Sequence, residues 1–197
     1  MRGCSRINEV KLNKTMVWPN LKACFRRLLS RFFQSSSKTA GEISPATPVS
    51  PKEPLVRYVT HEDRINWKHG FVKERQFHPD KRNELSTFRV RSLDNAEVTA
   101  LGESEVARKR VPPASLLGWA RFCASLVGQA HSDLFIDLRD DPTDPMHPRH
   151  AAIKGWPADE DAAVRTARIK AIAMIFSNNA KLELSEVGRQ IAARKRS

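Results

Sequence analysis

The feature that most limits how this 197-residue chain can fold is a stretch rich in serine, threonine and proline between Gln34 and Pro54. Prolines stand at positions 45, 48, 51 and 54, with few large apolar side chains between them. Such a segment buries too little apolar surface to offset the entropy lost on ordering. The sequence therefore predicts a basic arm and linker over residues 1–54, one domain over 55–178, and a C-terminal helix and basic tail over 179–197.

The positive charge of the chain lies mostly in its two ends. The formal net charge is +12, and residues 1–55 contain ten Lys and Arg against three Asp and Glu. Residues 56–178 contain nineteen against seventeen, and residues 179–197 contain five against two. Because clustered Lys and Arg attract phosphate-rich partners, nucleic acid or an anionic membrane surface is expected to contact the ends rather than the middle.

Residues 18–33 (WPNLKACFRRLLSRFF) show the apolar spacing of an amphipathic helix. A Leu and Phe face opposite basic residues is typical of a helix that lies at an anionic membrane surface. Docking of this helix on a partner or on the domain itself is the alternative, and a start of translation at Met16 is another. The residues expected to contact membrane or nucleic acid are Lys22, Arg26, Arg27, Arg31, Arg194, Lys195 and Arg196.

Local patterns in the middle of the chain predict several short strands. Residues 84–90 (ELSTFRV) alternate between apolar and polar side chains, as a strand with one buried face does. Residues 134–138 and 151–154 are also read as strands. The apolar run at 116–127 fits either a strand or a helix, with the alternation of Trp119, Arg121 and Cys123 favouring a strand.

Helices are predicted over 94–102, where Asp94 and Glu97 form a capping box, over 159–178 and over 186–193. The resulting order of strands and helices lacks the strict alternation of a parallel, doubly wound sheet. We therefore predict an α+β fold. It consists of a small antiparallel sheet packed against two or three helices, with a disordered or helical basic N-terminal arm.

Composition points to a cytoplasmic protein. No apolar run approaches the length of a membrane span, and the polar start of the chain does not resemble a secretory signal. Cys4, Cys24 and Cys123 are scattered and odd in number, which favours a reducing compartment, and Cys123 is predicted to be buried in its apolar run. A peripheral position at the inner membrane surface is the alternative that the amphipathic arm adds.

The densest polar cluster runs from Asp137 to Pro157. Loops that carry such clusters often carry function, although a proline-stiffened surface turn is the favoured interpretation of this one. His147 and His150, together with the nearby Asp residues, could bind a divalent metal ion, but no cofactor is otherwise expected. The candidate residues are Asp137, Arg139, Asp141, Asp144, His147, His150 and Trp156.

Common catalytic motifs are absent from the sequence. It contains no Gly-rich phosphate loop with a following Lys, no Gly-x-Ser-x-Gly elbow and no Cys-x-x-Cys pair. Between His61 and Glu84, aromatic and basic residues alternate as they do on surfaces that bind single-stranded nucleic acid, but acidic residues dilute the pattern. No enzyme class follows from these residues.

The segments LSTFRV, LFIDLRDDP and HAAIKGWP, in this order, resemble those of a group of small uncharacterised bacterial proteins. The resemblance covers roughly residues 57–176 and leaves the N-terminal arm outside it. It implies a bacterial, cytoplasmic protein that is an accessory component of a toxin or defence-type module. It implies no particular activity.

Two hypotheses about function follow. The first is a non-enzymatic binding or adaptor protein whose domain contacts another protein while its basic ends contact nucleic acid or membrane. The second is a small metal-dependent hydrolase or nuclease that uses the loop from Asp137 to His150. The charge distribution and the missing catalytic motifs favour the first.

Overall fold

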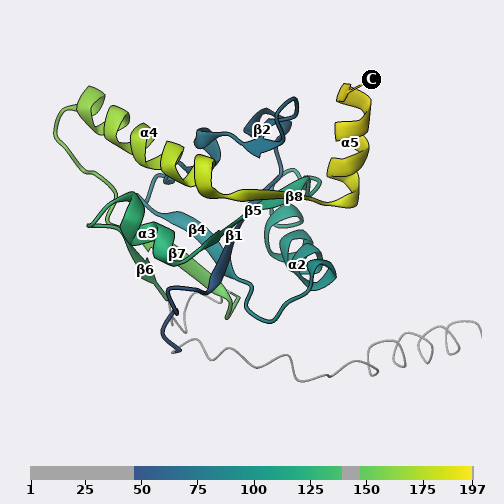
Figure 1. Ribbon diagram of the computed structural model, residues 1–197, viewed down its shortest axis with the longest axis horizontal. Helices are drawn as coiled ribbons and strands as arrows, with labels where there is room; N and C mark the ends of the chain where they lie inside the picture. The colour runs from purple at the N-terminus through teal and green to yellow at the C-terminus, as the bar shows by residue number, and fades with distance from the viewer. Residues whose placement is uncertain (1–46, 139–146, 197) are drawn as a thin grey trace, which may run out of the picture. The chain divides into compact units, whose positions relative to one another are not determined.

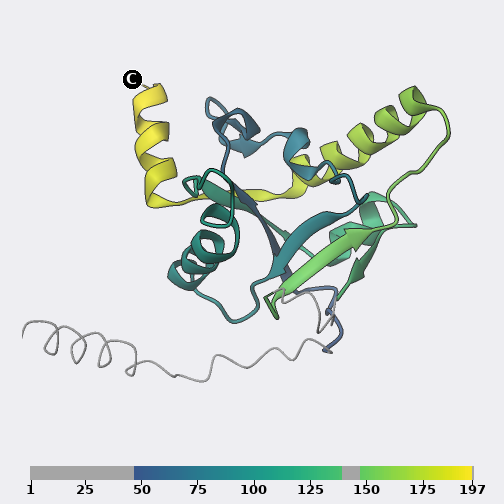
Figure 2. The same ribbon diagram turned by 180° about the vertical axis from the view of Figure 1, so that it is seen from behind.

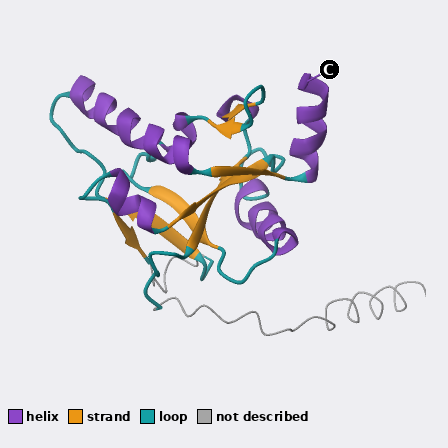
Figure 3. Ribbon diagram, in the orientation of Figure 1, coloured by secondary structure: helices purple, strands orange, loops and turns teal. Residues whose placement is uncertain are grey.

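The computed structural model describes residues 47–138 and 147–196. They form an α+β fold built on a six-stranded sheet, in which every neighbouring pair of strands is antiparallel (Figures 1 and 3). The strand order is β6-β7-β4-β1-β5-β8. The strands are β1 (Pro54–Val59), β4 (Leu85–Arg89), β5 (Gly118–Cys123), β6 (Phe135–Asp137), β7 (His150–Lys154) and β8 (Lys181–Leu184). The predicted fold class is confirmed.

Both faces of the sheet are covered. Side chains alternate along a strand, so Leu55 and Val59 of β1 pack in one apolar cluster while Val56 and Tyr58 pack in another. A strand buried on both faces has no polar side, and this is why β1 shows no alternating pattern in the sequence. In Figures 1 and 2, α2 and α5 lie at one end of the sheet, and α3 and the start of α4 lie at the other.

The larger cluster is built around Phe176 of helix α4 (Ala162–Asn179). Its ring stacks on Phe77 at 5.7 Å between centroids and meets Phe122 edge-on at 5.3 Å. Phe77 belongs to the 3₁₀ turn η2 (Glu74–Phe77), which follows the small hairpin of β2 (Ile65–Asn66) and β3 (Phe71–Val72). Helix α3 (Ser125–Ala130) closes the same cluster, and the short turn η1 (Glu62–Arg64) precedes the hairpin.

The second cluster lies under helix α2 (Asn95–Gly102) and the π-helical turn η3 (Glu103–Ala107). The predicted capping box starts α2: the Asp94 side chain accepts from the amide N–H of Glu97 at 2.8 Å, and the Glu97 side chain accepts from that of Asp94 at 2.9 Å. Tyr58 ties the helix to the sheet by donating to the Val98 carbonyl at 2.8 Å. Its ring occupies the space that a Cβ at Gly102 would need, so glycine is required there.

Most of the predicted elements are present. The predicted strands at 84–90, 134–138 and 151–154 are β4, β6 and β7, and the predicted helices are α2, α4 and α5 (Glu186–Arg196). The ambiguous run at 116–127 contains both alternatives in succession, β5 and then the start of α3. The prediction that Cys123 is buried is wrong, because its thiol is exposed at the end of β5.

The folded unit extends beyond the predicted limits of 55 and 178. Glu53 is only 2% exposed, Pro54 opens β1, and Val49 packs against the larger cluster. At the other end, β8 pairs with β5 along the edge of the sheet, and Gly188 of α5 is buried against the Leu117 carbonyl. Within the described residues, no helix combines the length and apolar character needed to cross a bilayer. The predicted amphipathic arm lies outside the described residues.

Candidate functional site

The candidate site begins where β1 and β4 separate. The two strands pair only at Leu55 with Arg89 and at Val56 with Phe88. Beyond this short ladder the Ser86 carbonyl accepts from Nη1 of Arg57 at 2.7 Å instead of from a β1 amide. On the β1 side, the Tyr58 carbonyl accepts from the buried side chain of Gln76 in η2 at 2.7 Å instead of from a β4 amide. Arg57 is thereby held between the two strands.

A cavity of about 400 Å³ opens beside this separation. Its aromatic wall is made by Tyr58 and Phe88, and Ser86 and His150 lie on neighbouring strands of its sheet side. The remaining lining residues are Arg57, Glu105, Val106, Lys109, Arg110 and His147. The lining therefore combines cationic groups, imidazoles and the hydroxyls of Tyr58 and Ser86, with Glu105 as its carboxylate.

Ser86 and His150 form a close polar contact in the cavity. The Oγ atom of Ser86 lies 2.6 Å from Nε2 of His150. His150 pairs with Phe88 in the β4–β7 register, so Ser86 is its diagonal neighbour on the same face of the sheet. The His150 ring also meets Phe88 edge-on at 5.3 Å, which fixes the imidazole over the strand.

Arg57 and Arg110 lie close together, and the nearby charge of Asp80 acts on Arg57 without forming an ion pair with it. Neither forms an ion pair within residues 47–138 and 147–196, and Nε of Arg110 is buried without a hydrogen-bond partner there. Burial, followed by the nearby charge of Arg110, lowers the pKa of Arg57 to about 10. Arg57 remains protonated at neutral pH, so two positive charges repel each other in this part of the cavity.

A second cavity of about 570 Å³ adjoins the first and shares Arg57 and Arg110 with it. Its other lining residues are His61, Arg64, Arg75, Gln76, His78, Pro79 and Asp80. Asp80 lies in the turn that precedes β4, and its carboxylate accepts hydrogen bonds from the amide N–H groups of Arg82 and Glu84. We refer to the two cavities together as the basic cleft.

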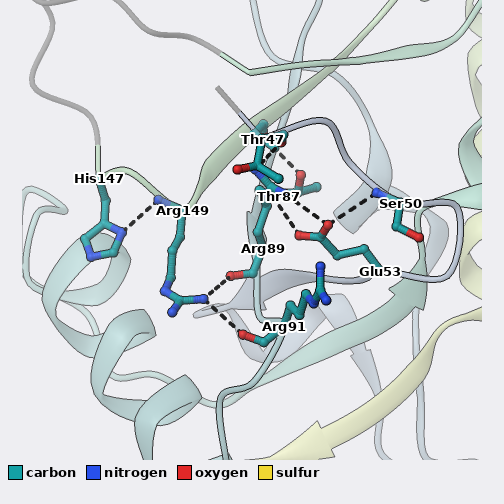
Figure 4. Close-up of polar contacts among 9 residues, drawn as sticks. Thr47, Ser50, Glu53, Thr87, Arg89, Arg91, His147 and Arg149 are labelled. Carbon is teal, nitrogen blue, oxygen red and sulfur yellow. Dashed lines mark hydrogen bonds and ion pairs between the residues drawn. The ribbon is translucent and has the colours of Figure 1, made fainter. Parts of the chain in front are cut away.

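His147 is positioned by a chain of contacts that starts in the core (Figure 4). Its Nδ1 accepts from the Arg149 amide at 3.2 Å, and Nη1 of Arg149 donates to the Arg91 carbonyl at 3.2 Å. The amide of Arg89 in turn donates to the Arg149 carbonyl at 2.8 Å. The Arg89 side chain is held by Glu53 through bonds of 2.6 and 3.0 Å, so the buried ion pair sets the edge of the cleft.

The structure brings some of the predicted site residues together and separates others. His147 and His150 line one cavity, as the loop hypothesis requires. Asp137 does not line it, because β6 directs its carboxylate to Lys154 at 2.5 Å. Trp156, another candidate residue, does not line it either: its side chain is only 3% exposed and packs beside Phe176 in the other cluster. Arg139, Asp141 and Asp144 lie outside the described residues.

The metal hypothesis remains a prediction. Among the described residues, no group of three His, Cys, Asp or Glu side chains is placed to hold an ion. Nε2 of His150 contacts the Ser86 hydroxyl, and Nδ1 of His147 accepts the Arg149 amide. A metal bound by both imidazoles would take Nε2 of His147, and on His150 it would either displace the Ser86 contact or take Nδ1.

Sequence reasoning missed Ser86, Arg57 and Arg110 as site residues. Ser86 stands in a segment predicted as a strand, Arg57 stands in a short apolar segment for which no element was predicted, and Arg110 stands in a basic run before two prolines. A charged or hydroxyl side chain within an apolar segment is a usable signal, because such a side chain needs either a hydrogen-bond partner or a cavity once it is buried. The sequence does not show which of the two applies, since that depends on how distant segments pair.

The predicted contact residues of the C-terminal end are on the last turns of α5, which carry Arg194, Lys195 and Arg196. Lys195 pairs with Glu62 at 2.8 Å and lies 5.7 Å from the centre of the Trp67 ring. Lys22, Arg26, Arg27 and Arg31 lie outside the described residues. Comparisons with family models, curated proteins and solved structures found no match to this chain.

Acidification should destabilise the fold before its carboxylates titrate. Burial is the main cause that lowers the pKa of both His78 and His147 below 6.5. Between those lowered values and about pH 6.5, the unfolded chain binds more protons than the folded one, so stability falls as pH falls. We expect the thermal midpoint to drop between about pH 6.5 and 5, and to drop less in a His78→Gln, His147→Gln double variant. A midpoint that rises over this range would contradict the expectation.

Proposed function

We propose that this protein binds a phosphate-bearing partner, and that the domain receives the phosphates of a nucleic-acid strand in the basic cleft. The observation that carries the proposal is the placement of Arg57 and Arg110 between two adjoining cavities without a carboxylate partner among the described residues. It refines the adaptor hypothesis, since the domain itself now offers an anion site in addition to the basic ends.

Electrostatics favours an anion at this position. Repulsion from Arg110 contributes to the lowered pKa of Arg57, so an anion between the two guanidinium groups would relieve an unfavourable interaction. Nη1 and Nε of Arg57 are bonded to backbone carbonyls, so its Nη2 is the atom that would donate to a phosphate oxygen. The buried Nε of Arg110 supplies a donor that no described residue satisfies. A phosphate would neutralise the charge and accept from this donor.

A strand of nucleic acid fits the cleft better than a single small anion. The two cavities adjoin, and cationic residues line both: Lys109 on one side, and Arg64 and Arg75 on the other. Tyr58 and Phe88 give the first cavity an apolar wall, with both rings buried in the second cluster. Because the contacts are mostly to phosphate, binding should be salt-dependent and largely insensitive to sequence.

Removing the two shared arginines should weaken binding strongly. We expect an Arg57→Gln, Arg110→Gln variant to bind a fluorescent single-stranded oligonucleotide at least about tenfold more weakly than the unaltered chain. Each charge-assisted hydrogen bond is worth about 1.5–3 kcal/mol, and about 1.4 kcal/mol corresponds to tenfold in affinity. Fluorescence anisotropy at several salt concentrations measures both the affinity and the salt slope.

The matched control is an Arg165→Gln, Lys181→Gln variant, which removes two exposed positive charges outside the cleft. It should change the affinity by less than about threefold, as a long-range charge in screened solvent does. Equal loss in the control and the cleft variant would show that net charge alone drives binding. Unchanged affinity in the cleft variant, with loss only after removal of the basic ends, would overturn the proposal.

A further inference from the structure

The contact between Ser86 and His150 resembles a nucleophile beside its base. The hydroxyl oxygen lies 2.6 Å from Nε2, within the range at which an imidazole can remove a proton from an attacking hydroxyl. In the tautomer with a proton on Nδ1, the hydroxyl donates to Nε2. Both residues line the same cavity, and Ser86 is half-buried rather than sealed, so a bound substrate can reach its oxygen.

The Arg57 guanidinium is bonded to the backbone of Ser86. Nη1 of Arg57 is 2.7 Å from the carbonyl of Ser86 itself, and its Nε donates to the Gln76 carbonyl at 3.3 Å. The guanidinium is thus fixed on both sides, and its position does not depend on the substrate. Arg57 and Ser86 line the same cavity, so this fixed positive charge can stabilise negative charge that develops on a substrate bound there.

We propose that Ser86 is a nucleophile activated by His150, and that the pair cleaves a phosphoester bound in the basic cleft. This inference rests on the proposed function for the position of the phosphate. It names the chemistry of the same site, and it differs from the metal-dependent hydrolase hypothesis because the nucleophile is a side chain.

The step balances without a further reactant besides water. Oγ of Ser86 attacks phosphorus while its proton passes to Nε2 of His150, and the bond from phosphorus to the leaving oxygen breaks. His150 returns the proton to that oxygen, which departs as an alcohol. Water then attacks the phosphoseryl intermediate, gives a proton to His150, and the Ser86 oxygen leaves with that proton. Arg57 remains protonated throughout.

The test uses a neutral alkyl fluorophosphonate carrying a fluorophore, which reacts with activated serines and does not need the anion site. We expect the full chain to be labelled at Ser86, as located by peptide mass spectrometry. Ser86→Ala should abolish labelling, and Ser132→Ala, an exposed serine outside the cleft, should leave it unchanged. His150→Gln can still hydrogen-bond to Ser86 but is not a base, and should slow labelling at least about a hundredfold.

A pH profile of labelling in the unaltered chain tests the proposal without any variant, so it does not depend on whether the variants fold. Labelling should fall along a single titration as pH is lowered and the base is protonated. Absent labelling of Ser86, or a pH-independent rate, or an equal rate in folded His150→Gln would overturn the proposal.

Hydrolysis of bis(p-nitrophenyl) phosphate and of p-nitrophenyl acetate separates the substrate classes. Turnover of the phosphodiester, lost in Ser86→Ala, supports the proposal, whereas turnover of the acetate alone overturns the phosphoester assignment. Oligonucleotide binding without labelling leaves the proposed function standing and removes this inference. Labelling without oligonucleotide binding removes the proposed function while the nucleophile remains.

Discussion

Replacing Glu53 with alanine should lower the free energy of unfolding by about 3–5 kcal/mol, the cost of removing one partner of a buried ion pair. The Glu53 and Arg89 side chains are 0% and 1% exposed, and two bonds of 2.6 and 3.0 Å join them. Among the described residues, the substitution leaves only the backbone carbonyl of Thr47, at 2.9 Å, to accept from the buried Arg89 side chain. Chemical denaturation followed by circular dichroism measures the loss.

Lys52→Ala is the matched control, because this neighbour is exposed and should change stability by less than about 0.5 kcal/mol.

Two deletions test the same ion pair at the boundary of the domain. Removal of residues 1–46 leaves the contacts of Glu53 in place and should cost little, whereas removal of residues 1–54 should cost at least as much as Glu53→Ala. Equal stability of the two truncated chains would show that the ion pair contributes nothing net.

Replacing Phe176 with alanine should cost a similar amount, about 3–5 kcal/mol, through lost apolar burial and the cavity left behind. Its ring is 0% exposed and packs against Phe77, Phe122 and Trp156. Phe77 lies in η2 beside Gln76, whose carbonyl holds Arg57, so the same change should loosen the basic cleft and weaken oligonucleotide binding. Thermal and chemical denaturation give the first effect, and anisotropy gives the second.

Met174→Ala serves as the control on the same helix, since Met174 is 47% exposed. It should change stability by less than about 1 kcal/mol, because little apolar surface returns to water. A Phe176→Leu variant should fall between the two, since leucine refills most of the space. A loss below about 1 kcal/mol for Phe176→Ala would mean that the cluster repacks around the gap.

Elements with local signals were predicted correctly. The reciprocal hydrogen bonds of Asp94 and Glu97 start α2, and the side chain of Asp161 accepts two amides at the start of α4. These interactions join residues that are two or three positions apart, so the sequence contains both partners in one window. The strand over 84–90 was predicted from its alternation in the same way.

Elements without local signals were missed. β1 is buried on both faces and therefore has no polar alternation, and β8 is an edge strand of mixed character between two helices. The run at 116–127 was ambiguous because a strand and a helix follow one another within it. Periodicity cannot resolve such segments, since their burial depends on what packs against them.

By itself, the sequence determined the uneven charge of the chain, the capped helices and the α+β class, because each depends on composition or on contacts between near neighbours. It also indicated His147 and His150. The tertiary structure alone decided that His150 meets Ser86, 64 residues away, and that Arg57 lies in the opening between β1 and β4. It also decided that Trp156 belongs to the core. Strand pairing brings distant residues together through backbone hydrogen bonds that any side chain permits, so no local pattern records which residues will share a site.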